Sequence, residues 1–173
     1  MHDNSRIFLG LGSNMGDRYQ NLKKGIHLLN NHPHIWVIDQ SHVYESAPLY
    51  HTDQKDFYNL VLEMDTNLIP VDFLNEIKKI EKKAGRDSQS KKNMPRTLDI
   101  DILAIGNLQI HSGILEVPHP RISERKFVLK PWKDIAPDFR LPESSATIAD
   151  ILDNTEDNSQ VRMVLILDKE NSN

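Results

Sequence analysis

Two acidic residues interrupt an otherwise apolar stretch of the sequence, PRTLDIDILA. Leu98, Ile100 and Ile102 alternate with Asp99 and Asp101, which predicts a β-strand with one apolar face and one acidic face. Residues two apart on a strand lie about 6.6 to 7 Å apart, where two carboxylates can bridge metal ions or repel each other. The alternation alone is weak evidence for chemistry, because edge strands often carry outward acids.

Basic side chains near this stretch change its interpretation. Arg96 immediately precedes the strand and Lys92 lies just before it, while His119, Arg121 and Arg125 follow in the segment VPHPRISER. Carboxylates that hold Mg²⁺, together with cations that bind the remaining phosphate oxygens, are the recurrent apparatus of phosphoryl transfer. The residue types therefore favour phosphate chemistry over a plain acidic surface.

The composition limits the class of protein. The chain has 173 residues, 38% of them hydrophobic and 27% charged, with a net charge of -4 and no cysteine. These values suit a single globular domain over residues 1–173 and argue against a protein that attracts nucleic acid by overall charge. No apolar run is long enough to span a bilayer, and the first residues lack the order of a signal peptide. We therefore expect a cytoplasmic monomer without membrane or nucleic-acid partners.

The apolar periodicity predicts elements in the order βαββαβ, followed by a C-terminal extension. The expected strands are Arg6 to Gly12, Ile35 to Tyr44, Phe57 to Thr66 and the strand from Leu98, and the expected helices are Tyr19 to Leu29 and Pro70 to Gly85. This order is that of an α+β ferredoxin-like core, an antiparallel sheet with both helices on one face. In the extension we expect short helices near 123–129 and 147–152 and an apolar end at 161–167.

If both helices cover the same face of the sheet, the opposite face can hold a site. Phe57 and Asn59 fall on that face of the third expected strand, as Asp99 and Asp101 do on the fourth. An aromatic ring, an amide that both donates and accepts hydrogen bonds, and two carboxylates would then share the uncovered face. This combination suits a flat polar heterocycle beside a metal-bound anion.

Three further features of the sequence bear on the site. The glycines in GLGSNMG resemble a phosphate-binding loop, but the GK[ST] ending is missing, so we predict a tight turn between strand and helix. Glu81 lies one helical turn after Lys78 and can be its solvated partner. The polar, basic segment from Arg86 to Pro95 has the composition of a loop, and we expect it to close over the site as a lid.

The sequence contains four longer motifs in order: GLGSNMGDR, YESAPLYHTDQKDFYNLV, PRTLDIDIL and VPHPRISERKFVLKPWKDIAPD. Together they resemble the 6-hydroxymethyl-7,8-dihydropterin pyrophosphokinase family of folate biosynthesis, with a match from about Ile7 to Pro142. The resemblance implies a Mg-dependent enzyme with ATP and 6-hydroxymethyl-7,8-dihydropterin as its partners. Diphosphate would pass from ATP to the hydroxymethyl group of the pterin, and AMP would be released.

The resemblance also implies roles for individual residues. Asp99 and Asp101 would bind two Mg²⁺ ions. The catalytic set would be Arg86, Lys92, Arg96, Asp99 and Asp101. The ATP-binding set would be Lys78, Glu81, Lys92, Arg96, Ile102, His119, Arg121 and Arg125. The pterin-binding set would be Ser46, Ala47, Leu49, Phe57, Asn59 and Phe127, with two aromatic rings on either side of the bicycle.

The chain departs from the family pattern in a few positions. Some members carry Trp-Gly where this chain has Asn93-Met94, and others have arginine at Ser88, glutamine at Lys78 or tyrosine at Phe57. None of these differences removes the pair of carboxylates. The contribution of the 86–95 loop to ring stacking is the feature that they leave open.

Two other classes of protein share the expected topology. A palm-type nucleotidyl transferase would also place carboxylates on such a sheet, but it would attack the α-phosphorus and release diphosphate rather than AMP. An RNA-binding module would need exposed aromatic residues and a basic sheet face, where Asp99 and Asp101 would repel phosphate.

Overall fold

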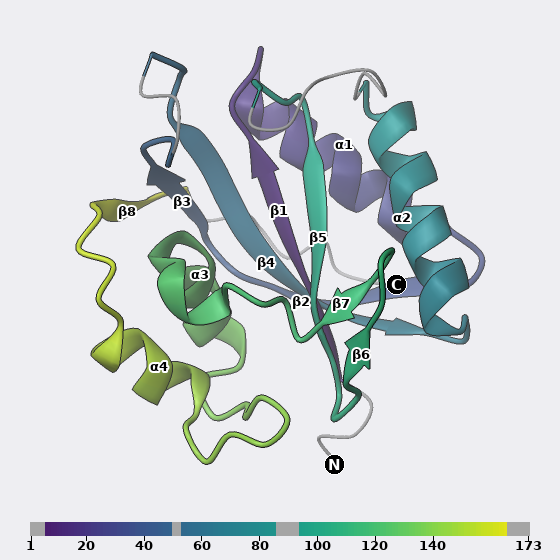
Figure 1. The fold of residues 1–173 in the computed structure, drawn as a ribbon. Coiled ribbons are helices and arrows are strands. Elements are labelled where there is room, and N and C mark those ends of the chain that lie inside the picture. Colours follow the sequence, from purple (N-terminus) through teal and green to yellow (C-terminus); the bar gives the residue numbers. More distant parts are fainter. Residues whose placement is uncertain (1–5, 50–52, 86–93, 166–173) are drawn as a thin grey trace.

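The computed structural model of the chain describes residues 6–49, 53–85 and 94–165, which form an antiparallel sheet with helices on both faces (Figure 1). The strands of the main sheet are β1 (Ile7–Ser13), β2 (Ile35–Gln40), β3 (Val43–Ser46), β4 (Phe57–Thr66), β5 (Asp99–Ile105) and β8 (Val161–Leu165). The helices are α1 (Arg18–Asn30), α2 (Pro70–Lys83), α3 (Lys126–Ile135) and α4 (Ile148–Asn154). A 3-10 turn at Ile122–Glu124 precedes α3, and β6 (Ile110–His111) pairs with β7 (Glu116–Val117). The predicted α+β class with an antiparallel sheet is confirmed.

The first strand lies inside the sheet. The strand order is β5-β1-β4-β3-β8, with β2 also paired to β4, and every pairing is antiparallel. Because β1 has β4 on one side and β5 on the other, it brings together two segments that are far apart in the sequence. Among the described residues, no helix combines the length and the apolar character that crossing a membrane requires.

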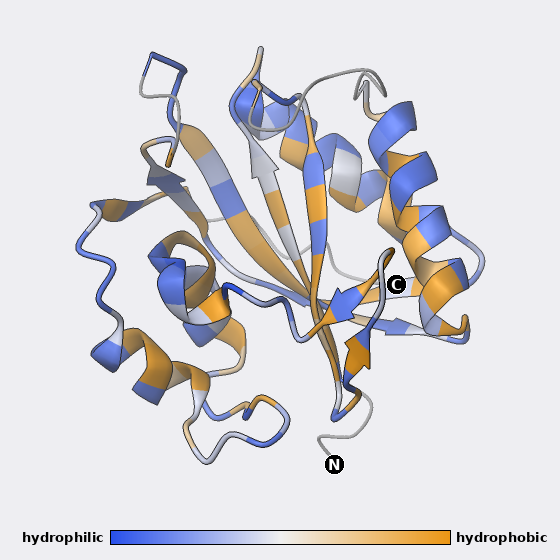
Figure 2. Cartoon of the chain, in the orientation of Figure 1, coloured by the Kyte–Doolittle hydropathy of each residue, from blue (hydrophilic) through white to orange (hydrophobic). Residues whose placement is uncertain are grey.

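Helices α1 and α2 cover one face of the sheet, as the sequence predicts (Figure 1). Local signals set where these helices begin: the Asp17 side chain accepts a hydrogen bond from Gln20 N at 3.0 Å, and Pro70 stands in the first turn of α2. Figure 2 shows hydrophobic residues alternating with polar ones along the strands. The side chains packed between this face and the helices include Leu9, Leu11, Leu22, Ile26, Leu60, Leu62, Phe73, Ile77, Leu98, Ile100 and Ile102.

Helix α3 covers part of the opposite face, so the prediction that this face is uncovered is wrong for that part. A second cluster joins Phe8, Val61 and Leu103 of the sheet to Trp132 of α3. Burying these apolar side chains stabilises the fold at roughly 25 cal/mol per Å² of apolar surface removed from water. This layer was not predicted from the sequence, because α3 continues to Ile135 whereas the expected helix ends near residue 129.

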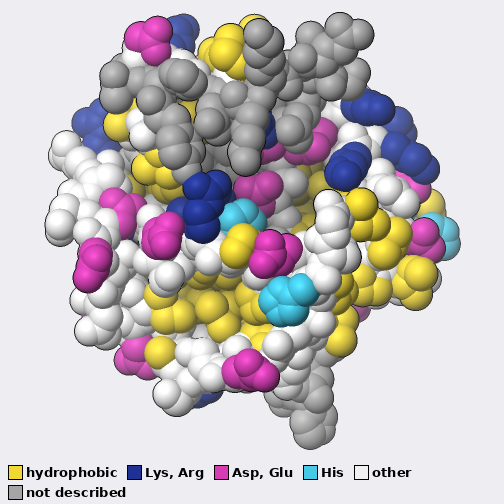
Figure 3. Space-filling view, in the orientation of Figure 1, with side chains coloured by type: hydrophobic (Ala, Val, Ile, Leu, Met, Phe, Trp, Pro, Cys, Tyr) yellow, Lys and Arg dark blue, Asp and Glu magenta, His cyan; other side chains and the backbone are white. Residues whose placement is uncertain are grey.

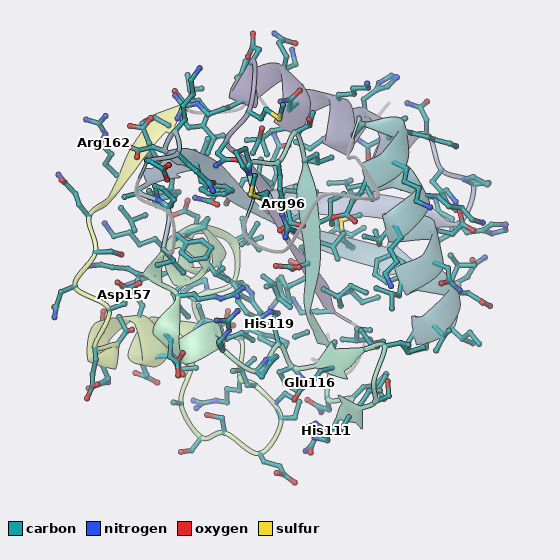
Figure 4. All side chains as sticks on the ribbon, turned by 45° about the horizontal axis from the view of Figure 1, so that its top comes forward. Arg96, His111, Glu116, His119, Asp157 and Arg162 are labelled. Carbon is teal, nitrogen blue, oxygen red and sulfur yellow. The ribbon has the colours of Figure 1, made fainter. Side chains whose placement is uncertain are left out.

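Polar contacts hold both ends of α3 in place. Asp157, labelled in Figure 4, accepts a hydrogen bond from the backbone N–H of Lys126 at 2.8 Å, at the first residue of the helix. At the other end of α3, Asp134 accepts hydrogen bonds from the Tyr44 hydroxyl at 3.0 and 3.1 Å. Burial and this carboxylate both raise the pKa of Tyr44 well above its ordinary value.

Two predicted elements differ in detail. The strand expected from residues 35 to 44 is divided into β2 and β3, because the Ser41 hydroxyl accepts a hydrogen bond from Val61 N at 2.9 Å in place of a regular ladder bond. The glycine-rich stretch is not all turn. Gly10 and Gly12 belong to β1, and the turn is made at Gly16, which has a φ of 64°.

Candidate functional site

A cavity of about 380 Å³ opens on the sheet face that α3 covers only in part. This volume lies in the range of small-molecule sites. In Figure 3, basic, acidic and histidine side chains meet near the middle of the face, with hydrophobic side chains below them. The sequence candidates that line the cavity are Ser46, Ala47, Leu49, Phe57, Asn59, Arg96, Asp99, Asp101, His119, Arg121, Arg125 and Phe127.

The two carboxylates of β5 both have arginine neighbours. Arg96 Nη1 lies 2.6 Å from Asp99 Oδ1, and Arg125 Nη1 lies 3.7 Å from Asp101 Oδ2. The exposed fraction of the side chain is 26% for Asp99 and 46% for Asp101, so both carboxylates remain accessible from the cavity. The guanidinium groups offset the repulsion that the sequence analysis considered for this pair.

These carboxylates fit a Mg²⁺ site that is complete only when a substrate phosphate is bound. Mg²⁺ takes oxygen ligands, commonly one or two carboxylates together with substrate phosphates and several waters. Across the described ranges, no group of three or more His, Asp or Glu side chains could hold a metal by itself. Asp99 and Asp101 could supply the protein ligands of such a site, and phosphate and water oxygens would supply the rest.

Histidine and arginine line the wall next to the carboxylates, where Figure 4 labels Arg96 and His119. Arg125 Nη1 lies 3.3 Å from His119 Nε2, and the backbone N–H of Arg121 donates to His119 Nδ1 at 3.2 Å. Burial, and then the charges of Arg125 and Arg121, lower the pKa of His119 to about 4. His119 is therefore neutral at pH 7, and the positive charge of this wall comes from its arginines.

The other end of the cavity offers flat and hydrogen-bonding surfaces. Asn59 is 5% exposed, and its Nδ2 donates to the Ser46 hydroxyl at 2.9 Å, which fixes the orientation of the amide. Phe57 comes from β4 and Phe127 from the first turn of α3, and both rings line the cavity. The predicted grouping of Phe57 and Asn59 with the two aspartates on one sheet face is confirmed.

Asn14 organises the site and was missed by the sequence analysis. It is 2% exposed, its Nδ2 donates to Gln54 Oε1 at 2.9 Å, and its Oδ1 accepts from Arg96 N at 2.7 Å. Its backbone N–H also donates to Arg96 O at 3.1 Å. One buried amide thus joins the end of β1 to the segment before β4 and to the arginine that contacts Asp99. The sequence signal was an asparagine directly after a strand, a residue type that can satisfy two segments at once.

Other candidates do not line the cavity. Lys78 is exposed on α2, and Ile102 packs against the helices on the opposite face. The interpretation of Glu81 as a solvated side chain is wrong, because it is 5% exposed and its Oε1 accepts from Ile100 N at 2.8 Å. Arg86 and Lys92 lie outside the described residues, as does most of the expected lid.

The sequence is similar to a family of known enzymes. The 7,8-dihydro-6-hydroxymethylpterin-pyrophosphokinase (HPPK) family matches residues 8–137. The 2-amino-4-hydroxy-6-hydroxymethyldihydropteridine pyrophosphokinase of Bacillus subtilis is 37% identical over 143 residues, which cover 83% of this chain and 85% of that protein. The folic acid synthesis protein FOL1 of Dictyostelium discoideum is 41% identical over 139 residues, which cover 80% of this chain.

The chain spans only part of many of these relatives. It covers 21% of the Dictyostelium protein and 26% of the folate synthesis bifunctional protein of Arabidopsis thaliana. Solved structures have the same fold: Plasmodium falciparum HPPK-DHPS wild type with pteroate has a TM-score of 0.67 and 17% identity, and covers 86% of this chain and 42% of that one. At this identity the likeness concerns the fold alone.

Proposed function

The chain belongs to the 7,8-dihydro-6-hydroxymethylpterin-pyrophosphokinase family, and from this premise we propose that it makes a pterin diphosphate. The hydroxymethyl oxygen of 6-hydroxymethyl-7,8-dihydropterin attacks the β-phosphorus of ATP and forms a new O–P bond. The bond from the β-phosphorus to the oxygen that bridges to the α-phosphorus breaks. AMP leaves with that oxygen, and the hydroxyl proton passes to solvent.

One observation carries this proposal: the same cavity has a flat hydrogen-bonding end and a charged end. Phe57, Asn59 and Phe127 line one end, and Asp99 and Asp101 line the other. A reaction between a heterocyclic alcohol and a nucleoside triphosphate needs both ends at once, because holding the two reactants together removes the entropic cost of their encounter.

The pterin would bind at the flat end. Phe57 and Phe127 offer two rings for stacking on the bicycle, and Asn59 offers an amide for its polar edge. The hydrogen bond from Asn59 to Ser46 holds that amide in place before the ligand arrives. Ala47 and Leu49, on the segment after β3, would complete the pocket wall.

The triphosphate would bind at the charged end. Arg96, Arg121 and Arg125 are donors suited to phosphate oxygens, and neutral His119 can contact a phosphate without adding charge. Bound Mg²⁺, held by Asp99 and Asp101 and expected as two ions, would neutralise charge on the phosphates. Arg96 and Arg125 would then exchange part of their contact with the carboxylates for contact with the nucleotide.

The residues proposed to bind the adenosine half of ATP lie outside the cavity. We keep Lys78, Glu81 and the Ile102 backbone as candidates for it, which requires ATP to reach past the cavity to the outer edge of β5. Glu81 already contacts that edge through Ile100 N, which supports a role in shaping it. Arg86 and Lys92 remain proposed catalytic residues of the segment before β5.

We further propose that the core is a ferredoxin-like βαββαβ unit within a single domain. The first strand lies between the third and the last strands of that unit, which are β4 and β5. In the same unit, β2 and β3 together take the place of the second strand, because both pair with β4. The antiparallel order supports the assignment.

The test is to identify the nucleotide that the reaction releases. Incubation of the protein with Mg-ATP and 6-hydroxymethyl-7,8-dihydropterin should release AMP and pterin diphosphate in equal amounts. Release of ADP would indicate transfer of a single phosphoryl group. Release of diphosphate would indicate attack at the α-phosphorus, as in a palm-type nucleotidyl transferase, and either result would contradict the proposal.

A further inference from the structure

Two glycines of β1 lie across the middle of the cavity. Gly12 is paired with Asn59 of β4 on one side and with Asp99 of β5 on the other. Gly10 is paired in the same way with Val61 and Asp101. Gly12 therefore separates the amide at the flat end of the cavity from a carboxylate at the charged end.

The backbone does not require glycine at these two positions. The described glycines with positive φ are Gly16, Gly85 and Gly106, whereas Gly10 and Gly12 lie within a regular strand. Glycine in the interior of a strand is unfavourable, and it often marks a place where a ligand or another chain segment approaches closely. The backbone conformation therefore does not explain the glycine at residue 12, and the atoms that surround its Cα on the cavity side do.

That space differs between the two glycines. A Cβ on residue 12 would lie 3.2 Å from Asn59 Oδ1 and 3.7 Å from Phe57 Cδ1. A Cβ on residue 10 would meet the side chain of Leu103, with 3.4 Å as its shortest contact. Asn59 cannot move away freely, because its Nδ2 is bonded to Ser46, whereas the 3.4 Å contact with Leu103 is an ordinary van der Waals distance.

We propose that Gly12 is a specificity-determining residue that keeps a strip of bare backbone open between the pterin pocket and the carboxylates. The inference rests on the proposed function and extends it. A flat bicycle held between Phe57 and Phe127 can bring one edge against this strip and extend its hydroxymethyl group toward Asp99. A side chain at residue 12 would push that edge away from the strip and the Asn59 amide out of position.

The test compares the same substitution at the two glycines. Gly12→Ala should weaken binding of 6-hydroxymethylpterin about 10- to 200-fold, the range for one misplaced methyl-sized group in a pocket. Its affinity for a Mg²⁺ complex of a non-hydrolysable ATP analogue should change less than about threefold, which is below that range. Gly10→Ala is the matched control on the same strand and face, and it should lose much less pterin affinity.

Calorimetric titration measures both ligands, and circular dichroism shows whether each variant folds. If Gly12→Ala is folded and binds the pterin as well as the wild type does, the inference is overturned while the proposed function stands. Equal losses for Gly12→Ala and Gly10→Ala would also overturn it. If the wild type does not bind the pterin at all, the proposed function itself fails.

A second measurement on the unaltered protein covers the case in which Gly12→Ala does not fold. In NMR spectra, saturation with 6-hydroxymethylpterin should shift the amide signal of Gly12, because an aromatic ring next to this residue changes the local magnetic field. The signal of Gly113, whose surroundings are open within 4 Å, should stay in place as the internal reference. A Gly12 signal that stays in place while the pterin binds would overturn the inference.

Discussion

Two halves of one sheet face have opposite roles in this protein. In the core half, Phe8, Val61 and Leu103 pack against Trp132 of α3, and the rings of Phe8 and Trp132 lie 5.0 Å apart. The site half begins one pleat further along the same three strands. It consists of Gly12, Phe57, Asn59, Asp99 and Asp101.

The difference lies in what holds the side chains. In the core half, apolar contacts and burial do so. In the site half, hydrogen bonds and ion pairs do so: Ser46 holds Asn59, and Arg96 contacts Asp99. Substitutions in the core half should therefore change the free energy of unfolding, and substitutions in the site half should change ligand binding and rate.

The largest effect is expected from the carboxylates. Asp99→Asn or Asp101→Asn keeps the shape of the side chain but removes the charge proposed to hold Mg²⁺, so kcat should fall about a thousandfold, which corresponds to several kcal/mol. The free energy of unfolding should change by less than about 1 kcal/mol, since both side chains are partly exposed. Steady-state rates and urea unfolding check the two expectations. A wild-type rate in either purified variant would show that the carboxylates do not take part.

The core half should show the reverse. Phe8→Ala removes a fully buried ring that lies 5.0 Å from Trp132 and 4.8 Å from Phe139, and should lower the free energy of unfolding by about 3 to 5 kcal/mol. At a temperature where the variant is folded, its affinity for the pterin should equal that of the wild type. Urea unfolding and calorimetry measure the two quantities. A selective loss of pterin affinity would mean that the halves are not independent.

Within the site half, Phe57→Ala should separate the two ligands. Loss of stacking and burial should weaken pterin binding by about 1 to 3 kcal/mol, with little change for a non-hydrolysable ATP analogue. Calorimetry with each ligand measures this. Equal losses for both ligands would indicate that Phe57 supports the fold rather than the pterin pocket.

The last effect concerns the dependence of stability on pH. The pKa of His119 is lowered from 6.5 to about 4, so the unfolded chain binds a proton there between these pH values and the folded chain does not. The free energy of unfolding should therefore fall as the pH drops from 6.5 toward 4, and His119→Gln should remove that part of the fall. Urea unfolding across this range measures it, with His34→Gln at an exposed histidine as the control. The same pH dependence in wild type and His119→Gln would contradict the assignment.

Periodicity was sufficient to predict which face of each strand would hold the site. The alternation of Leu98 with Asp99, and of Phe57 with Tyr58, identified the face because side chains alternate on any strand. The pairing of Gly12 with Asn59 and Asp99 could not be predicted, because register depends on partners far apart in the chain. The alternating glycines of GLG can be seen in the sequence. The position of Gly12 between Asn59 and Asp99 follows only from the strand register.

The boundary between the two halves was hidden for a different reason. It depends on α3, whose helix contains Pro131, a residue that ordinarily ends a helix. The helix nevertheless continues to Ile135, and the neighbouring Trp132 is buried in the second cluster. Tertiary packing of this kind overrides local propensity, so a sequence pattern alone gives too short a helix.

The most direct test of the account asks which atoms join when both ends of the cavity are filled. The protein is given Mg-ATP and 6-hydroxymethyl-7,8-dihydropterin whose hydroxymethyl oxygen is ¹⁸O, and the products are examined by ³¹P NMR. We expect an isotope shift on the phosphorus bonded to the pterin oxygen in the pterin diphosphate, with unlabelled AMP. An isotope shift on the α-phosphorus, or a pterin diphosphate without the label, would contradict it.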